Sequence, residues 1–299
     1  MWLLLAFLSA VLLGFYDAFK KESLLGNAVL PVLFLNTLFS SLIFLPFIIA
    51  SACAPQLMHD TIFYVPEAGW DEHKYIILKS LIVLSSWTLG YFGMKHLPLT
   101  IVGPVNATRP VMVLIGAMLL FGERLNTCQW IGVALAIASF FMLSRSGKKE
   151  GIDFGHNRWI VCIVLAAVLG AVSGLYDKYL MARLDPMLVQ SWYNVYQLLI
   201  MGTVIALLWL PRRSSDTPFR WKWTILGISL FLSAADLAYF YSLSMEGSMV
   251  SVVSMVRRGS VVVSFIFGAM VFHEKNLKSK AIDLILVIIG MFFLYLGTK

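Results

Sequence analysis

Two adjacent arginines interrupt a long apolar stretch near the end of the chain. Arg257 and Arg258 lie in the run SMVRRGSVVV, and a third arginine, Arg109, lies in VNATRPVMV. A guanidinium group presents a planar fork of donors that binds carboxylate or phosphate through two hydrogen bonds. These three side chains could therefore hold an anionic group.

Three aspartates, Asp17, Asp177 and Asp236, also lie in apolar stretches. A carboxylate in such surroundings could bind and release a proton, so all three are candidates for proton coupling. Asp236 has no basic residue nearby in its own span and ranks first. For Asp17, a local ion pair with Lys20 or Lys21 is the competing interpretation.

The composition of the whole chain is that of an integral membrane protein. Of its 299 residues, 60% are hydrophobic and 13% are charged, whereas about a quarter of the residues in soluble domains are charged. The net charge of +7 fits basic loops beside anionic lipid, and no nucleic-acid partner is expected.

Apolar segments long enough to cross a bilayer recur along the chain, because a spanning helix needs about 20 apolar residues. The pattern predicts an all-α fold with about ten transmembrane helices. The expected spans are 3–20, 31–50, 75–93, 100–121, 128–144, 159–180, 187–210, 223–243, 248–272 and 281–297.

The two halves of the chain resemble each other. GFYDAF aligns with GLYDKY, LSSWTLGYF with LSAADLAYF, and GAMLLFGERL with GAMVFHEKNL, in the same order. Each half contains five spans, an odd number, so the second must be inverted relative to the first. We expect two inverted five-helix repeats, residues 1–146 and 157–299, an arrangement typical of secondary transporters with a substrate site near the midplane.

A proline, an apolar run and a Gly-Glu turn end the fourth span, in RPVMVLIGAMLLFGERL. With the tandem repeats, this motif resembles the EamA family of the drug/metabolite transporter superfamily over nearly the whole chain. The second copy departs from it, with Val261 in place of the proline and His273 in place of the glycine. The resemblance implies a multi-pass carrier of the inner (plasma) membrane that exports a small metabolite.

Relatives in the same superfamily extend this implication to anions. Some carry nucleotide sugars or sugar phosphates, and the plastid sugar-phosphate translocators have adjacent basic residues in the span equivalent to the ninth. Arg257 and Arg258 are similar in type and approximate place. The resemblance therefore implies an anion site, without identifying the substrate.

Helical geometry separates the two adjacent arginines, because consecutive residues differ in direction by about 100°. Ser254 and Arg258 share one stripe of the ninth span, and Asn106 and Arg109 share one of the fourth. Since these spans are repeat equivalents, we expect all three arginines to meet beside a midplane cavity and to bind a small anionic or zwitterionic metabolite.

Two alternatives to substrate binding by the arginines stay open. Arg257 could pair with Asp236 in a purely structural ion pair, which would be costly to break. A switch that exchanges partners during transport would combine both roles. Trp87, Tyr241 and Asn194 are further candidates for the cavity wall, although aromatic residues in spans more often serve packing or the interfacial belt.

Other classes of function leave little trace in the sequence. A membrane-embedded enzyme would need a nucleophile–base pair or a metal-ligand motif, and neither is visible. We therefore expect no catalytic residues, no metal and no cofactor. The remaining alternative is a non-transporting accessory membrane protein. Expected partners are a small-molecule metabolite and the lipid bilayer, with protons as a candidate coupling ion, for a monomer or homodimer.

The membrane orientation has two conflicting indications. Most basic loop residues, among them Lys20, Lys148 and Lys275, fall on one side, so the positive-inside rule places both termini outside. Members of the resembling superfamily are usually drawn with both termini in the cytoplasm. Both orientations stay open.

Overall fold

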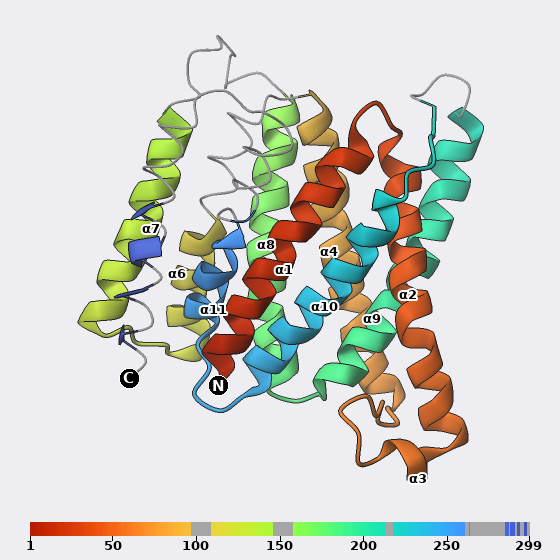
Figure 1. The fold of residues 1–299 in the computed structure, drawn as a ribbon, viewed down its shortest axis with the longest axis horizontal. Coiled ribbons are helices and arrows are strands. Elements are labelled where there is room, and N and C mark those ends of the chain that lie inside the picture. Colours follow the sequence, from red (N-terminus) through yellow and green to blue (C-terminus); the bar gives the residue numbers. More distant parts are fainter. Residues whose placement is uncertain are drawn as a thin grey trace.

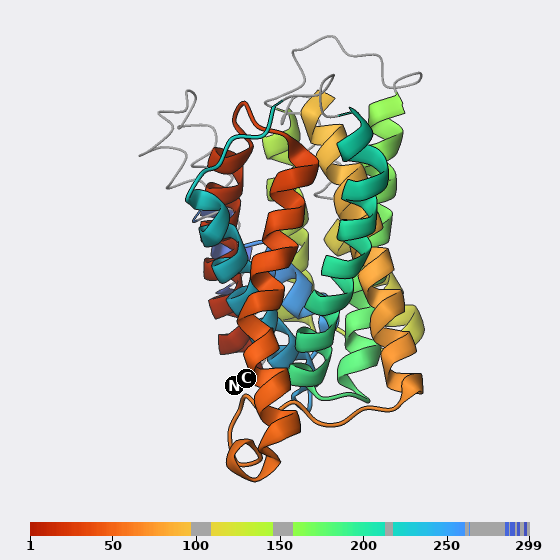
Figure 2. The same ribbon diagram turned by 90° about the vertical axis from the view of Figure 1, so that its right-hand side faces the viewer.

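The computed structural model describes residues 1–96, 109–145, 158–212, 218–260, 263, 285–286, 288–290, 292–293 and 296–297. Within these residues every regular element is helical. The long helices lie side by side in an elongated bundle (Figure 1). The segment 54–69 projects from the end of the bundle where the N-terminus lies, as Figure 2 shows.

Where both are described, the helices agree with the expected spans to within a few residues, except that the helix in the expected span 248–272 ends at Arg257. In the first half they are α1 (Trp2–Leu24), α2 (Val29–Cys53), the short α3 (Pro55–Met58), α4 (Trp70–His96), α6 (Arg109–Phe121) and α7 (Thr127–Arg145). In the second half they are α8 (Arg158–Met181), α9 (Pro186–Val204), α10 (Thr224–Ser244) and α11 (Val250–Arg257). A π-helical turn, η1 (Ile205–Trp209), and a 3₁₀ turn, η2 (Leu210–Arg212), extend α9.

Six of the described helices are long and apolar enough to cross a membrane, namely α1, α2, α4, α8, α9 with η1, and α10. The protein is therefore an all-helical, multi-pass membrane protein. The described parts of the fourth and ninth spans are α6 and α11, and most of the tenth lies outside the described residues. The total of ten spans stays a prediction.

Helices of the first half pack mainly on helices of the second. The most extensive contacts join α1 to α10 and α4 to α8, and further contacts join α2 to α9 and α6 to α11. Under the expected repeat, the contact of α1 with α10 is the counterpart of that of α4 with α8. The contacts of α2 with α9 and of α6 with α11 each join two equivalent spans. The two halves of the chain are therefore interleaved in space.

The first spans of the two halves run in opposite directions. The N-terminus, where α1 begins, lies at the same end of the bundle as the turn 182–185, where α8 has just ended (Figure 1). Glycine allows the helices to approach closely: a Cβ at Gly227 of α10 would lie 2.9 Å from the Phe19 ring of α1. Such small-residue contacts are how membrane helices pack tightly.

Candidate substrate-binding site

A cavity of about 410 Å³ lies between α1, α4, α6, α8, α9, α10 and α11. Its volume falls in the range of small-molecule sites, about 300–1,000 Å³. Eight charged side chains line it, and they come from both halves of the chain. The basic ones are Lys20, Lys79, Arg109, Arg257 and Arg258, and the acidic ones are Asp17, Asp177 and Asp236.

The broken end of α11 brings two arginines to this cavity. The helix ends at Arg257, and the amides of Arg258 and Gly259 turn back to the carbonyls of Met255 and Val256, at 3.1 and 2.8 Å. Broken helices beside a central cavity are typical of transporter substrate sites.

The other end of α11 is fixed by Glu123, the glutamate of the Gly-Glu turn after α6. Its carboxylate accepts hydrogen bonds from the amides of Val250 and Ser251, at 2.7 and 3.2 Å, and from the Ser251 hydroxyl. A carboxylate at a helix N-terminus also interacts favourably with the helix dipole. The motif that carried the family resemblance thus positions the helix that carries Arg257.

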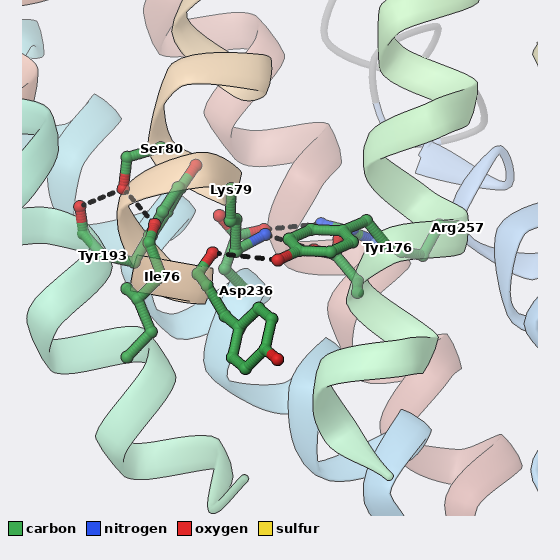
Figure 3. A network of polar contacts seen from close by, with 9 residues as sticks. Ile76, Lys79, Ser80, Tyr176, Tyr193, Asp236 and Arg257 are labelled. Atoms are coloured by element: carbon green, nitrogen blue, oxygen red, sulfur yellow. Dashed lines mark hydrogen bonds and ion pairs between the residues drawn. The ribbon is translucent and has the colours of Figure 1, made fainter. Parts of the chain in front are cut away.

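Arg257 is paired with Asp236, as one of the sequence alternatives proposed. Its Nη2 atom donates to Oδ1 of Asp236 at 2.7 Å (Figure 3). Its guanidinium also lies 4.0 Å from the centre of the Tyr239 ring. Asp236 is therefore held by an arginine, which stays charged at any physiological pH.

Arg109 is far less compensated. In the described structure its guanidinium donates one hydrogen bond, from Nη2 to the Ala166 carbonyl at 3.3 Å, while its Nε atom is buried without a hydrogen-bond partner. The charged groups that act on it are Arg258 and Arg257, which both repel it. The side chain lies directly against Gly170, where any Cβ would collide with it.

Arg258 also lines the cavity, but the carboxylate that interacts with it differs from that of Arg257. The acidic group that acts on its charge is Asp17 of α1, while Arg257 repels it. Arg258, Arg109 and Ser254 all line the cavity, whereas Asn106 lies outside the described residues.

A second ion pair, which was not predicted from the sequence, joins Lys79 of α4 to Asp177 of α8. Both side chains are buried, with 2% and 7% of their surface exposed. The Lys79 ammonium also lies 4.6 and 4.7 Å from the centres of the Tyr193 and Phe240 rings. Figure 3 shows Lys79 in one polar network with Asp236 and Arg257. A lysine inside the run IILKSLIV was the signal, since such a residue needs a buried partner.

Lys20 also lines the cavity, although the sequence predicted it to lie near a loop or to pair with Asp17. Its ammonium lies 4.4 Å from the centre of the Tyr91 ring and 5.2 Å from that of Tyr16. Because Lys20 lies near the end of α1, a local ion pair with Asp17 was the simplest interpretation. The structure adds that Lys20 lies on the cavity wall with these two tyrosines.

Of the remaining candidates, Trp87 lines the cavity, whereas Tyr241 and Asn194 do not. The Tyr241 hydroxyl donates to the Ile62 carbonyl at 2.9 Å near the surface, and the Asn194 amide donates to the Gln190 carbonyl of its own helix at 2.9 Å. Each is one or two residues from a cavity residue, Tyr193 or Tyr239, and the helical rotation of about 100° per residue turns it away.

Comparison with known proteins identifies the family. The model of the EamA-like transporter family matches residues 1–145 and 157–296. An uncharacterized transporter of Bacillus subtilis, YvbV, is 25% identical over 72% of this chain and 68% of its own. The S-adenosylmethionine uptake transporter of Rickettsia prowazekii is 21% identical over 90% of this chain and 83% of its own.

A solved crystal structure has the same fold. It superposes with a TM-score of 0.74 at 16% sequence identity and covers 99% of this chain and 97% of its own. At that identity the likeness shows the fold alone. The family match, which extends over nearly the whole sequence, shows more: this chain belongs to the EamA-like transporter family and is a membrane transporter rather than an enzyme.

Proposed function

We propose that the protein is a secondary transporter of a small anionic or zwitterionic metabolite, with Arg109 and Arg258 as its main ligands for the anionic group. Export across the inner membrane is the direction that the family resemblance implies. The Rickettsia relative is named as an uptake transporter. The test of this proposal therefore measures transport in both directions.

The observation that carries this proposal is the state of Arg109. Among the described residues this buried guanidinium has one carbonyl partner and two repelling arginines. An arginine inside a membrane is costly, by about 2.5–3.5 kcal/mol even on insertion scales. Arg109 lines the same cavity as Arg258, and its buried Nε has no hydrogen-bond partner within the described part of the chain. A carboxylate or phosphate of the substrate would supply the missing acceptors in the bidentate geometry that guanidinium prefers.

The proposed transport mechanism is alternating access between two inverted five-helix repeats. Its support is the interleaved packing of α1 on α10 and of α4 on α8, which places the cavity between the halves. Rocking one half against the other would expose such a central site to each side in turn. For a zwitterionic substrate, ring faces such as that of Trp87 would receive the ammonium group.

The test is transport by the full-length protein in liposomes. Amino acids, organic acids, sugar phosphates and S-adenosylmethionine are offered from each side, with and without a pH gradient. We expect transport of anions or zwitterions, and a loss of about tenfold to a hundredfold in affinity for Arg109→Ala and Arg258→Ala, because each removes a charge-assisted hydrogen bond worth about 1.5–3 kcal/mol.

Gly170→Ala is a variant that preserves every charge. It forces the Arg109 guanidinium away from its position and should weaken binding in the same direction as Arg109→Ala. Gly202→Ala in α9 is the matched control, since Gly202 does not line the cavity and a Cβ there meets only the Phe34 ring at 3.9 Å. Unchanged anion affinity in folded Arg109→Ala and Arg258→Ala protein would refute the proposed role of these arginines.

A further inference from the structure

We infer that the substrate carries two negative charges, one neutralised by Arg109 with Arg258 and the other by Lys20. This inference rests on the proposed function and adds the charge class of the substrate to it. The ligand chemistry is that of an organic dianion, either a phosphate monoester or a dicarboxylate.

The charge balance of the cavity wall is the first support. Five basic and three acidic side chains line it. Three carboxylates can neutralise at most three of the five cations, so two positive charges are left without a carboxylate. Within the described residues the cavity is therefore built with a surplus of two positive charges.

The neighbouring sequence does not alter this balance. Residues 97–108 precede Arg109 and residues 261–270 follow the arginine pair, and neither stretch contains an acidic or basic residue. The two spans that supply the arginines thus contribute no carboxylate of their own to offset the surplus.

Two of the three carboxylates are already paired with cations other than Arg109. Asp236 is bonded to Arg257, and Asp177 is bonded to Lys79 in a buried pair. The third carboxylate, that of Asp17, attracts the Arg258 guanidinium electrostatically. A substrate cation would find every carboxylate of the wall engaged, whereas a substrate anion would meet Arg109, on whose charge no described carboxylate acts.

Lys20 is the residue best placed to take the second negative charge. Its ammonium lies on the ring faces of Tyr91 and Tyr16, within the same cavity as Arg109. Ring faces attract a cation and leave its hydrogen-bond donors free, so they hold the ammonium in position without neutralising it. A second carboxylate, or the second charge of a phosphate, would complete the neutralisation.

The experiment measures binding by isothermal calorimetry to the purified full-length protein in lipid nanodiscs. Succinate is compared with its monomethyl ester, and glycerol phosphate with glycerol sulfate, so that each dianion has a monoanion of nearly the same shape. We expect each dianion to bind at least about tenfold more tightly than its matched monoanion. Because the second ionisation of a phosphate monoester lies near about pH 6, its binding should weaken below that pH.

Two lysine variants assign the second charge. Lys20→Met should reduce the ratio of dianion to monoanion affinity to near one. Lys74→Met is the matched control and should leave the ratio unchanged, because Lys74 is exposed and pairs with Asp71 away from the cavity. If Lys20→Met does not fold, the ratio measured for the native protein still decides the charge class.

The outcomes separate this inference from the proposed function. Equal binding of monoanions and dianions would overturn the inference and leave the proposed function standing. Binding of no anion in the panel would overturn both. A dianion preference that persists unchanged in Lys20→Met would overturn the assignment to Lys20. Tighter binding of either dianion supports the shared chemistry, and the better of the two identifies whether it is phosphate or dicarboxylate.

Discussion

The contacts of α1 with α10 and of α4 with α8 are repeat-related, yet the side chains between the helices differ. The match of Leu84–Phe92 with Leu232–Phe240 makes Gly227 the counterpart of Lys79. Between α4 and α8, Lys79 forms a buried ion pair with Asp177. Between α1 and α10, the Phe19 ring packs directly on Gly227, and Asp17, the counterpart of Asp177, acts on Arg258.

The helix packing is therefore similar in the two halves, whereas the charged residues are not. The helix packing needs only small residues and apolar faces, which both halves retain. If these charged groups bind the proposed substrate, a single molecule without twofold symmetry would not require the same charges in both halves. Asp236 is a second example, because its counterpart in α4 is the uncharged Thr88.

The largest effect should come from breaking the pair on the α4–α8 side. Lys79→Met leaves the Asp177 carboxylate buried without its cation, and we expect a loss of about 3–5 kcal/mol in stability. The double variant Lys79→Met/Asp177→Asn removes both charges and should recover more than half of that loss. Thermal unfolding in detergent measures both, and a single variant as stable as the native protein would contradict the structural importance of the pair.

A smaller loss is expected at the pair that lines the arginine wall. Arg257→Met removes a charge-assisted hydrogen bond to Asp236 and should cost about 1.5–3 kcal/mol. Arg257 and Asp236 retain 19% and 13% exposure, so water entering the cavity can solvate the carboxylate that remains. Arg257→Lys keeps the charge and should lose less. The same thermal unfolding measurement ranks the variants. A larger loss of stability for Arg257→Met than for Lys79→Met would contradict the expected order of the two pairs.

The α1–α10 side can be tested through its glycine. Gly227→Ala places a Cβ 2.9 Å from the Phe19 ring, which is itself stacked on Phe231 at 5.4 Å between centroids. Overpacking of this kind costs about 1–3 kcal/mol. Gly174→Ala, with room for its methyl group, is the control and should change stability little. Equal midpoints of thermal unfolding for the two variants would show that α1 and α10 can move apart without a loss of stability.

The smallest effect on stability, and an opposite effect on binding, is expected for Asp17→Asn. Removing this carboxylate leaves Arg258 less neutralised and raises the positive charge of the cavity, so anions should bind several-fold more tightly. The repeat-equivalent change Asp177→Asn should instead destabilise the protein, because it leaves Lys79 without its counter-charge. Calorimetric anion titrations of both variants make the comparison, and weaker anion binding by Asp17→Asn would contradict the charge balance proposed for the cavity.

Much of the scaffold was readable from the sequence, since the features involved are local. The expected span 159–180 became α8, Arg158–Met181, because the thickness of the bilayer sets the length of an apolar run. The pairing of Arg257 with Asp236 was also accessible as an alternative, since both lie in adjacent spans of one half, 21 residues apart. The family resemblance followed from the Gly-Glu motif and is confirmed.

The sequence by itself thus determined a helical membrane protein, its family, the approximate bounds of the six described spans and a set of arginines that need a partner. Only the tertiary structure decided which partner each charge has. Lys79 and Asp177 are 98 residues apart, Arg109 rests on Gly170 of another helix, and Tyr241 turns away from the cavity that Tyr239 lines. These outcomes depend on how each helix is rotated and crossed against its neighbours, and that rotation is set by packing across the two halves rather than by any one segment.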